Sequence, residues 1–229
     1  GAYLALMGVA ALSLAVMSRI PFPTLPGQGT THQQGRPTAE IVRQPVFIIA
    51  AAACAIGYGV MNLLMAATPI AMAQCNHPFS AAALVLEWHV LAMFVPSFFT
   101  GKLIKRFGVL PIMTLGLALN IACVAFALHG NDVMHFLGAL MALGLGWNFL
   151  FIGGSTLVTE TYAPEEKTRA QGALDFCVYT TMTVTSFSSG ALVTTGGWTA
   201  MNLGTLAPMA LMVAALVWLA RLQRAPAPA

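Results

Sequence analysis

Long apolar stretches separated by mostly short polar gaps constrain this chain more than any other feature. Seven stretches follow one another, over residues 2–18, 46–70, 80–100, 109–128, 133–158, 170–193 and 199–220. About 20 apolar residues in a helix cross the roughly 30 Å hydrocarbon core of a bilayer. Backbone polar groups find no water inside lipid, so segments of this length satisfy them as α-helices. The chain is therefore predicted to be an all-α membrane protein.

The basic residues occur only in alternate gaps between the apolar stretches and in the C-terminal tail. The first, third and fifth gaps and the C-terminal tail hold all ten Lys and Arg residues, which are Arg19, Arg36, Arg43, Lys102, Lys105, Arg106, Lys167, Arg169, Arg221 and Arg224. Because a zigzag chain exposes alternate gaps on opposite faces, the positive-inside rule places these gaps and the C-terminus in the cytoplasm. We expect a multi-pass protein of the plasma membrane (the bacterial inner membrane). The net charge of +3 follows from this topology and indicates no nucleic-acid partner.

Four segments are expected along the chain. Residues 1–18 lack a basic lead-in and are interpreted as the end of a truncated transmembrane helix, which suggests a piece of a longer protein. Residues 19–45 are rich in Pro, Gly and polar side chains and are predicted to be a flexible cytoplasmic linker. Residues 46–221 should form six complete helices, and residues 222–229 a cytoplasmic tail.

The six complete helices divide into three plus three. The middle helix of each triplet carries one acid, Glu87 in the first and Asp175 in the second, whereas the third helix of each has no ionisable group in its interior. This pattern predicts an inverted repeat in which the third helices face lipid and the others face a cavity.

Two loops carry a resemblance to a known family. The run Gly101-Lys-Leu-Ile-Lys-Arg106-Phe-Gly108 resembles the loop signature of the major facilitator superfamily, although Lys105 stands where that signature has Asp. The run from Glu160 to Gly172 is similar to the family's loop between helices 10 and 11.

The resemblance implies a transporter's C-terminal half, with the end of helix 6, the central loop and helices 7 to 12. The solute site would be shared with a missing N-terminal half. It also implies a charged gate at the cytoplasmic end, and the candidates are Gly101, Arg106, Gly108, Glu160 and Arg169. We expect Arg106 to approach Glu160 when the transporter is open outward.

Acids within apolar helices are candidates for proton coupling. An ionised carboxylate at depth in a membrane is costly, whereas the protonated form is tolerated, so Glu87 or Asp175 could load and release a proton. The alternative is a structural carboxylate that hydrogen-bonds to a neighbouring helix. His89 lies on another face of its helix from Glu87 and is interpreted as a packed, neutral histidine.

Polar and aromatic residues at helical spacing are candidates to line a solute cavity. Asp175, Tyr179, Met182 or Thr183, and Ser186 form one stripe of their helix. The full set of cavity candidates is Tyr58, Asn62, Trp147, Asn148, Ser155 and Tyr179. The alternative for each is packing or hydrogen bonding between helices, which uses the same residue types.

The function expected from these features is transmembrane transport of a small organic solute by alternating access. It should be secondary and proton-coupled, as a symporter or an antiporter, with lipid and solute as partners and no cofactor or metal. One alternative is a membrane receptor or scaffold that binds a solute without moving it. A remote alternative is an intramembrane serine protease built on Ser155, but no histidine is placed to serve as its base. We therefore expect no enzyme.

Overall fold

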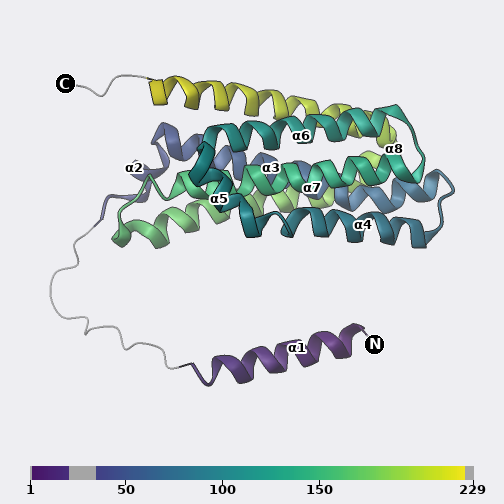
Figure 1. Cartoon of the computed structure of the whole chain (residues 1–229), viewed down its shortest axis with the longest axis horizontal. Helices are drawn as coiled ribbons and strands as arrows, with labels where there is room; N and C mark the ends of the chain where they lie inside the picture. Colours follow the sequence, from purple (N-terminus) through teal and green to yellow (C-terminus); the bar gives the residue numbers. More distant parts are fainter. Residues whose placement is uncertain (1, 21–34, 225–229) are drawn as a thin grey trace. The chain divides into compact units, whose positions relative to one another are not determined.

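The structure is a computed structural model that describes residues 2–20 and 35–224. Two units are described separately, because the chain divides between Gln34 and Gly35. The first unit contains α1 (Ala2–Met17), a single apolar helix (Figure 1), and its side chains from Tyr3 onward are exposed. Residues 21–34 of the predicted linker and residues 225–229 of the predicted tail lie outside the described residues.

The regular secondary structure of the second unit, residues 35–224, consists of helices joined by short turns (Figure 1). Its elements are α2 (Thr38–Val42), α3 (Pro45–Gln74), α4 (Phe79–Phe94), α5 (Ser97–Phe107), α6 (Val109–His129), α7 (Val133–Val158), the 3-10 turn η1 (Pro164–Glu166) and α8 (Lys167–Arg224). By length and composition, α3, α6, α7 and α8 can each cross a membrane, and α4 with α5 forms a further span bent by 42°. The prediction of an all-α membrane protein is confirmed.

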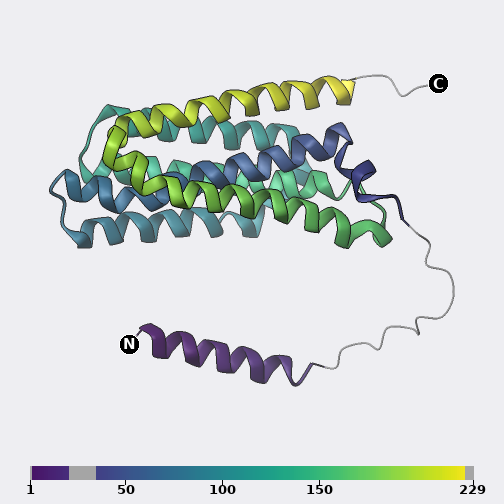
Figure 2. The ribbon, with the colours of Figure 1, turned by 180° about the vertical axis from the view of Figure 1, so that it is seen from behind.

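Helix α8 contains two of the predicted apolar stretches. Its backbone breaks at Gly197, where φ is 76° and ψ is 170°. Residues other than glycine rarely adopt a positive φ of this kind, because their Cβ would clash with the backbone, so the glycine permits the turn. Figure 2 shows the two arms of α8 folding back on each other at this break. The predicted stretches 170–193 and 199–220 are therefore separate helical arms.

The turns between helices gather at the two ends of this unit. Figure 1 places α2, the α5–α6 turn, the start of α8 and the end of α8 at one end. Gly108, with a φ of 90°, makes the tight turn from α5 to α6 at that end. All the Lys and Arg residues of the second unit occur in or close to these segments, within residues 36–43, 102–106, 167–169 and 221–224, so we call this the basic end. The zigzag inferred from the charges is what the chain adopts here, while the 3+3 inverted repeat stays a prediction.

Helix α7 packs against α3, α4, α5 and α6. Its glycines allow approach at backbone distance. A Cβ on Gly144 would lie 2.8 Å from the backbone oxygen of His89 in α4, and one on Gly146 would lie 2.7 Å from that of Gly116 in α6. A Cβ on Gly154 would lie 2.9 Å from a backbone oxygen of α3. Any larger residue at these positions would force the neighbouring helices apart.

The last part of the predicted linker is packed and not flexible. Helix α2 lies within residues 35–44 and contacts α8, and its Ile41 is fully buried in the core. The Gln44 amide nitrogen donates to the backbone oxygen of Thr161 at 2.9 Å. The prediction of a flexible linker is thus wrong for residues 35–44, because an apolar side chain and several hydrogen bonds anchor them to the helices.

We predict that Gly146→Ala lowers the thermal unfolding midpoint, because the new methyl group would clash with the backbone of α6. Overpacking of this kind costs about 1–3 kcal/mol. Gly204→Ala in α8 is the matched control, since its Cβ would meet no atom within 4 Å. Replacing an open helical glycine by alanine stabilises by roughly 0.5–1 kcal/mol. Thermal denaturation in detergent compares the two. An unchanged or higher midpoint for Gly146→Ala would refute the proposed close packing.

Candidate functional site

The two acids of the predicted spans lie on the outside of the second unit. Glu87 on α4 and Asp175 on α8 both have exposed side chains. Glu87 borders an open groove of about 570 Å³ on α4, with Leu86 and Val90 among its lining residues. Neither acid takes part in an ion pair among the described residues. The expected alternative, a carboxylate that hydrogen-bonds to a neighbouring helix, finds no partner among the described residues, because both acids project from faces that no other helix of the second unit covers. Their role in proton coupling stays a prediction.

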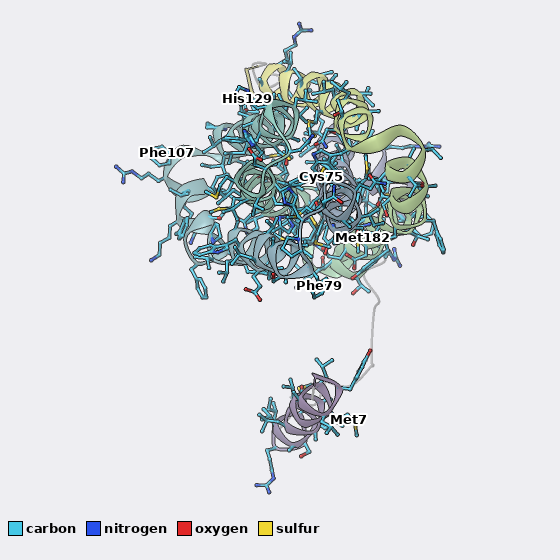
Figure 3. All side chains as sticks on the ribbon, turned by 90° about the vertical axis from the view of Figure 1, so that its right-hand side faces the viewer. Met7, Cys75, Phe79, Phe107, His129 and Met182 are labelled. Atoms are coloured by element: carbon cyan, nitrogen blue, oxygen red, sulfur yellow. The ribbon has the colours of Figure 1, made fainter. Side chains whose placement is uncertain are left out.

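The predicted polar stripe of α8 is also exposed. Asp175, Tyr179, Thr183 and Ser186 follow one another on one face of the first arm, and the side chain of Tyr179 is 63% exposed. The Thr183 hydroxyl donates to the backbone oxygen of Tyr179 at 2.8 Å. Figure 3 looks along the bundle from the end that carries Cys75 and His129, and its label on Met182 marks this arm of α8. Because the side chains of the stripe are exposed, they offer a carboxylate, a phenol and hydroxyls to whatever covers α8.

Asn62 joins α3 to α8. Its amide nitrogen lies 2.8 Å from the Ser186 hydroxyl, 3.0 Å from the Thr185 hydroxyl and 3.2 Å from the backbone oxygen of Met182. The side chain is buried. The packing alternative holds for this amide nitrogen, which fastens the polar stripe of α8 to its neighbour.

Asn148 is fully hydrogen-bonded at the bend between α4 and α5. Pro96 interrupts the helix and lacks an N–H, so carbonyls near the break need other donors. The Asn148 amide nitrogen donates to the Met93 carbonyl at 2.7 Å and to the Ser97 hydroxyl at 2.6 Å. The Thr100 hydroxyl donates to its Oδ1 at 2.7 Å. The expectation that Asn148 lines a cavity is therefore wrong, because all its polar atoms are used to hold the bend.

Four aromatic rings from three helices form a cluster. Trp147 stacks on Phe151 with ring centres 5.2 Å apart, and meets Tyr58 edge-on at 5.3 Å and Phe94 at 6.0 Å. Trp147 is 6% exposed and Phe94 is 56% exposed. Trp147 is thus a packing residue that supports an aromatic edge formed by Phe94 and Tyr58. Phe94 and Phe151 were not predicted; the i, i+4 spacing of Trp147 and Phe151 was the available signal.

Ser155 has a cysteine as its neighbour. The Cys54 sulfur lies 3.8 Å from the Ser155 hydroxyl and 3.6 Å from the backbone oxygen of Phe151. A nucleophilic serine needs a base within hydrogen-bond distance, usually histidine. No histidine of the described residues hydrogen-bonds to Ser155, so its surroundings are those of helix packing. His89 is buried as expected, with Nδ1 2.6 Å from the backbone oxygen of Leu140.

The predicted gate residues lie at the basic end but are not joined as expected. The Arg106 guanidinium lies 5.2 Å from the centre of its neighbour's ring, that of Phe107. Glu160 is exposed, and no ion pair among the described residues links it to Arg106. A Cβ on Gly101 would meet no atom within 4 Å, so no neighbouring helix packs closely against this glycine. The Arg106–Glu160 contact of an outward-open state stays a prediction.

A different charged contact holds the basic end together. The backbone N–H and Nε of Arg36 donate to Oε1 of Glu166 at 2.6 and 3.0 Å, and Arg36 Nη2 donates to Oε2 at 2.8 Å. The Ala163 N–H also donates to Oε2, at 3.0 Å. Arg169 donates to the carbonyl of Arg36 at 3.2 Å. We call this the Arg36–Glu166 clasp, and it fastens the segment before α3 to the loop before α8.

The environment of Glu166 explains its charge state. The carboxylate is only 3% exposed. Hydrogen bonding from the Arg36 guanidinium is the main cause that lowers the pKa of Glu166 to about 2. Stability that depends on this depressed pKa is present above the unfolded value near 4.5 and is lost as the pH falls toward 2. Sequence reasoning did not select Glu166, although the paired acids after Pro164 were visible.

We predict that Glu166→Gln loosens residues 35–44, because an amide cannot accept from all the donors that the carboxylate serves. Hydrogen–deuterium exchange of this segment should increase severalfold. Glu165→Gln is the matched control, since Glu165 is exposed and adjacent. In the parent, exchange corrected for its intrinsic pH dependence should not change between about pH 5 and 8. Equal exchange in both variants would contradict the clasp.

Comparisons with known proteins agree with this architecture. The Major Facilitator Superfamily matches residues 49–229. The riboflavin transporter RfnT of Brucella anthropi is 45% identical over 93% of this chain and 53% of its own length. Two uncharacterised MFS-type transporters of Bacillus subtilis, YdeG and YddS, are 32% and 27% identical over 69% of this chain and 37% of their lengths. The chain thus spans about half or less of these relatives, which are named as transporters and not as enzymes. On the residues that match, the chain belongs to the Major Facilitator Superfamily.

Proposed function

We propose that this chain forms one half of a secondary transporter that carries a planar organic solute, riboflavin or a molecule much like it, across a membrane by alternating access. The observation that carries the proposal is the pair of acids, Glu87 and Asp175, whose side chains are exposed on the surface of the second unit. An acidic side chain at the centre of a membrane helix costs about 2.5–3.5 kcal/mol when it faces lipid. The faces of α4 and α8 that bear these acids are therefore assigned to a hydrated cavity.

The chemistry of these faces suits a flat solute with hydroxyl groups. The exposed ring of Phe94 and the partly exposed ring of Tyr58 offer an apolar edge on which a fused ring can stack. Tyr179, Thr183 and Ser186 supply hydroxyls along α8. Riboflavin combines a planar ring system with a polyhydroxy chain. Its assignment draws on the name of the 45% identical relative, which covers almost the whole of this chain.

A second helical half completes the proposed cavity. The RfnT relative is nearly twice as long as the matched region, which leaves room for a half of comparable size. In this arrangement the basic end and the C-terminus face the cytoplasm of a plasma membrane, following the positive-inside rule. The two halves rock about the solute, and Glu87 or Asp175 exchanges a proton as the cavity changes its exposure.

We predict that Phe94→Ala raises the KM for riboflavin uptake about 2- to 12-fold, which corresponds to the roughly 0.5–1.5 kcal/mol of an aromatic stacking contact. Uptake by the full-length protein in vesicles is the measurement. Phe79→Ala is the control, because Phe79 lies at the start of α4 outside the aromatic cluster and is also exposed. Riboflavin binding without any uptake by the parent would support a solute-binding receptor and contradict transport.

We predict that Glu87→Gln or Asp175→Asn abolishes accumulation driven by an imposed pH gradient while solute exchange continues. The amide keeps the shape of the side chain but cannot carry a proton. Glu165→Gln, which removes an exposed acid of the loop before α8, should accumulate solute like the parent. If both amide variants respond to the gradient as the parent does, neither acid carries the coupling proton.

A further inference from the structure

An apolar groove runs between α6 and the second arm of α8. It has a volume of about 340 Å³, and Leu117 and Leu216, both nearly buried, lie at its floor. The partly exposed side chains of Ile121, Val213 and Val217 line it as well. Neither α6 nor the second arm of α8 contains an Asp or Glu. This groove is separate from the exposed acids of α4 and the first arm of α8, so it needs a different occupant from the solute.

The groove has the length of one membrane leaflet. On α6 its lining begins at Leu110, close to the Gly108 turn of the basic end, and extends to Ile121. At 1.5 Å per residue, these eleven steps cover about 16 Å. Half of a hydrocarbon core of roughly 30 Å is about 15 Å. The groove therefore runs from the basic end to about the middle of the membrane.

A positive charge lies where the groove meets the basic end. Val217 and Ala220 line the groove on α8, and Arg221 follows Val217 by four residues, which places it on the same helix face. The Arg221 side chain is exposed. A guanidinium at this level matches the height of lipid phosphates at the surface of the leaflet.

We propose that this groove binds an anionic phospholipid, with one acyl chain between α6 and α8 and the headgroup at Arg221. The protein's groove provides apolar walls over the depth of a single leaflet, and Arg221 provides the selectivity for negative charge. The only polar side chain in the lining, Thr114, already donates its hydroxyl to the backbone oxygen of Leu110 at 2.9 Å, so an apolar chain leaves no donor unpaired.

A second copy of the chain fits this face less well. Two copies related by a two-fold axis along the membrane normal would bring their Arg221 residues together at the same level. Like charges placed opposite each other disfavour such an interface. A lipid phosphate has the opposite sign and so complements the site.

The test is lipid binding to the full-length protein in detergent, measured by native mass spectrometry with phosphatidylglycerol and phosphatidylcholine of identical acyl chains. The parent should bind phosphatidylglycerol more tightly. Arg221→Gln should weaken phosphatidylglycerol binding about fivefold, the effect expected of one basic residue near an anionic headgroup, and leave phosphatidylcholine binding unchanged. Lys102→Gln, which removes another exposed basic residue of the basic end, should change neither.

A second pair of variants tests the acyl-chain part of the site. Ala118→Phe fills the groove and should weaken binding of both lipids, whereas Leu211→Phe, at an exposed position of α8 outside the lining, should not. Equal binding of the two lipids by the parent, or equal effects of Arg221→Gln and Lys102→Gln, would overturn the proposal. A dimer that Ala118→Phe abolishes would also overturn it and assign the groove to a second copy.

Discussion

The packing of α7 at backbone distance is the constraint on which the rest of the second unit depends. Glycines at 144, 146 and 154 on this helix leave no room for a Cβ against α4, α6 and α3. Inside a membrane, helices gain little from the hydrophobic effect on association, so close van der Waals contact and interhelical hydrogen bonds must hold them together. Because α7 contacts α3, α4, α5 and α6, its small residues set the position of the polar face of α4 directly. The position of α8 depends on α7 indirectly, since α8 packs against α3 and α6.

Hydrogen bonding separates the polar residues into two groups. The amide nitrogens of Asn62 and Asn148 donate hydrogen bonds to neighbouring helices. Asn148 also accepts one, so it supplies the donors and the acceptor that a helix broken by proline lacks. Glu87 and Asp175 have no such partners among the described residues and face outward. The first group behaves as structural connections. The acids of the second group cost free energy in a membrane unless water or another part of the protein solvates their carboxylates, and this difference motivates the assignment of a cavity.

Much of the fold follows from the sequence, because span length and the placement of basic residues are both set by the membrane. The break at Gly197 and the turn at Gly108 coincide with predicted gaps. The site was less predictable, because an asparagine or an acid in an apolar helix has the same local pattern whether it faces a neighbour or a cavity. Asn148 faces its neighbours across the bend, whereas Glu87 projects from the surface of the unit. The Arg36–Glu166 clasp joins residues 130 positions apart, and no spacing rule connects them.

A solute cavity on this half requires that the polar face of α8 borders water and not lipid. Thiol labelling tests it most directly, in the full-length protein with its native cysteines replaced and a single cysteine at position 183 or 211. A water-soluble maleimide should label position 183 on the polar stripe, and riboflavin should slow that labelling, while position 211 on the second arm should react poorly. If position 183 resists the reagent as position 211 does, the stripe faces lipid, and the account of a solute cavity on this half is contradicted.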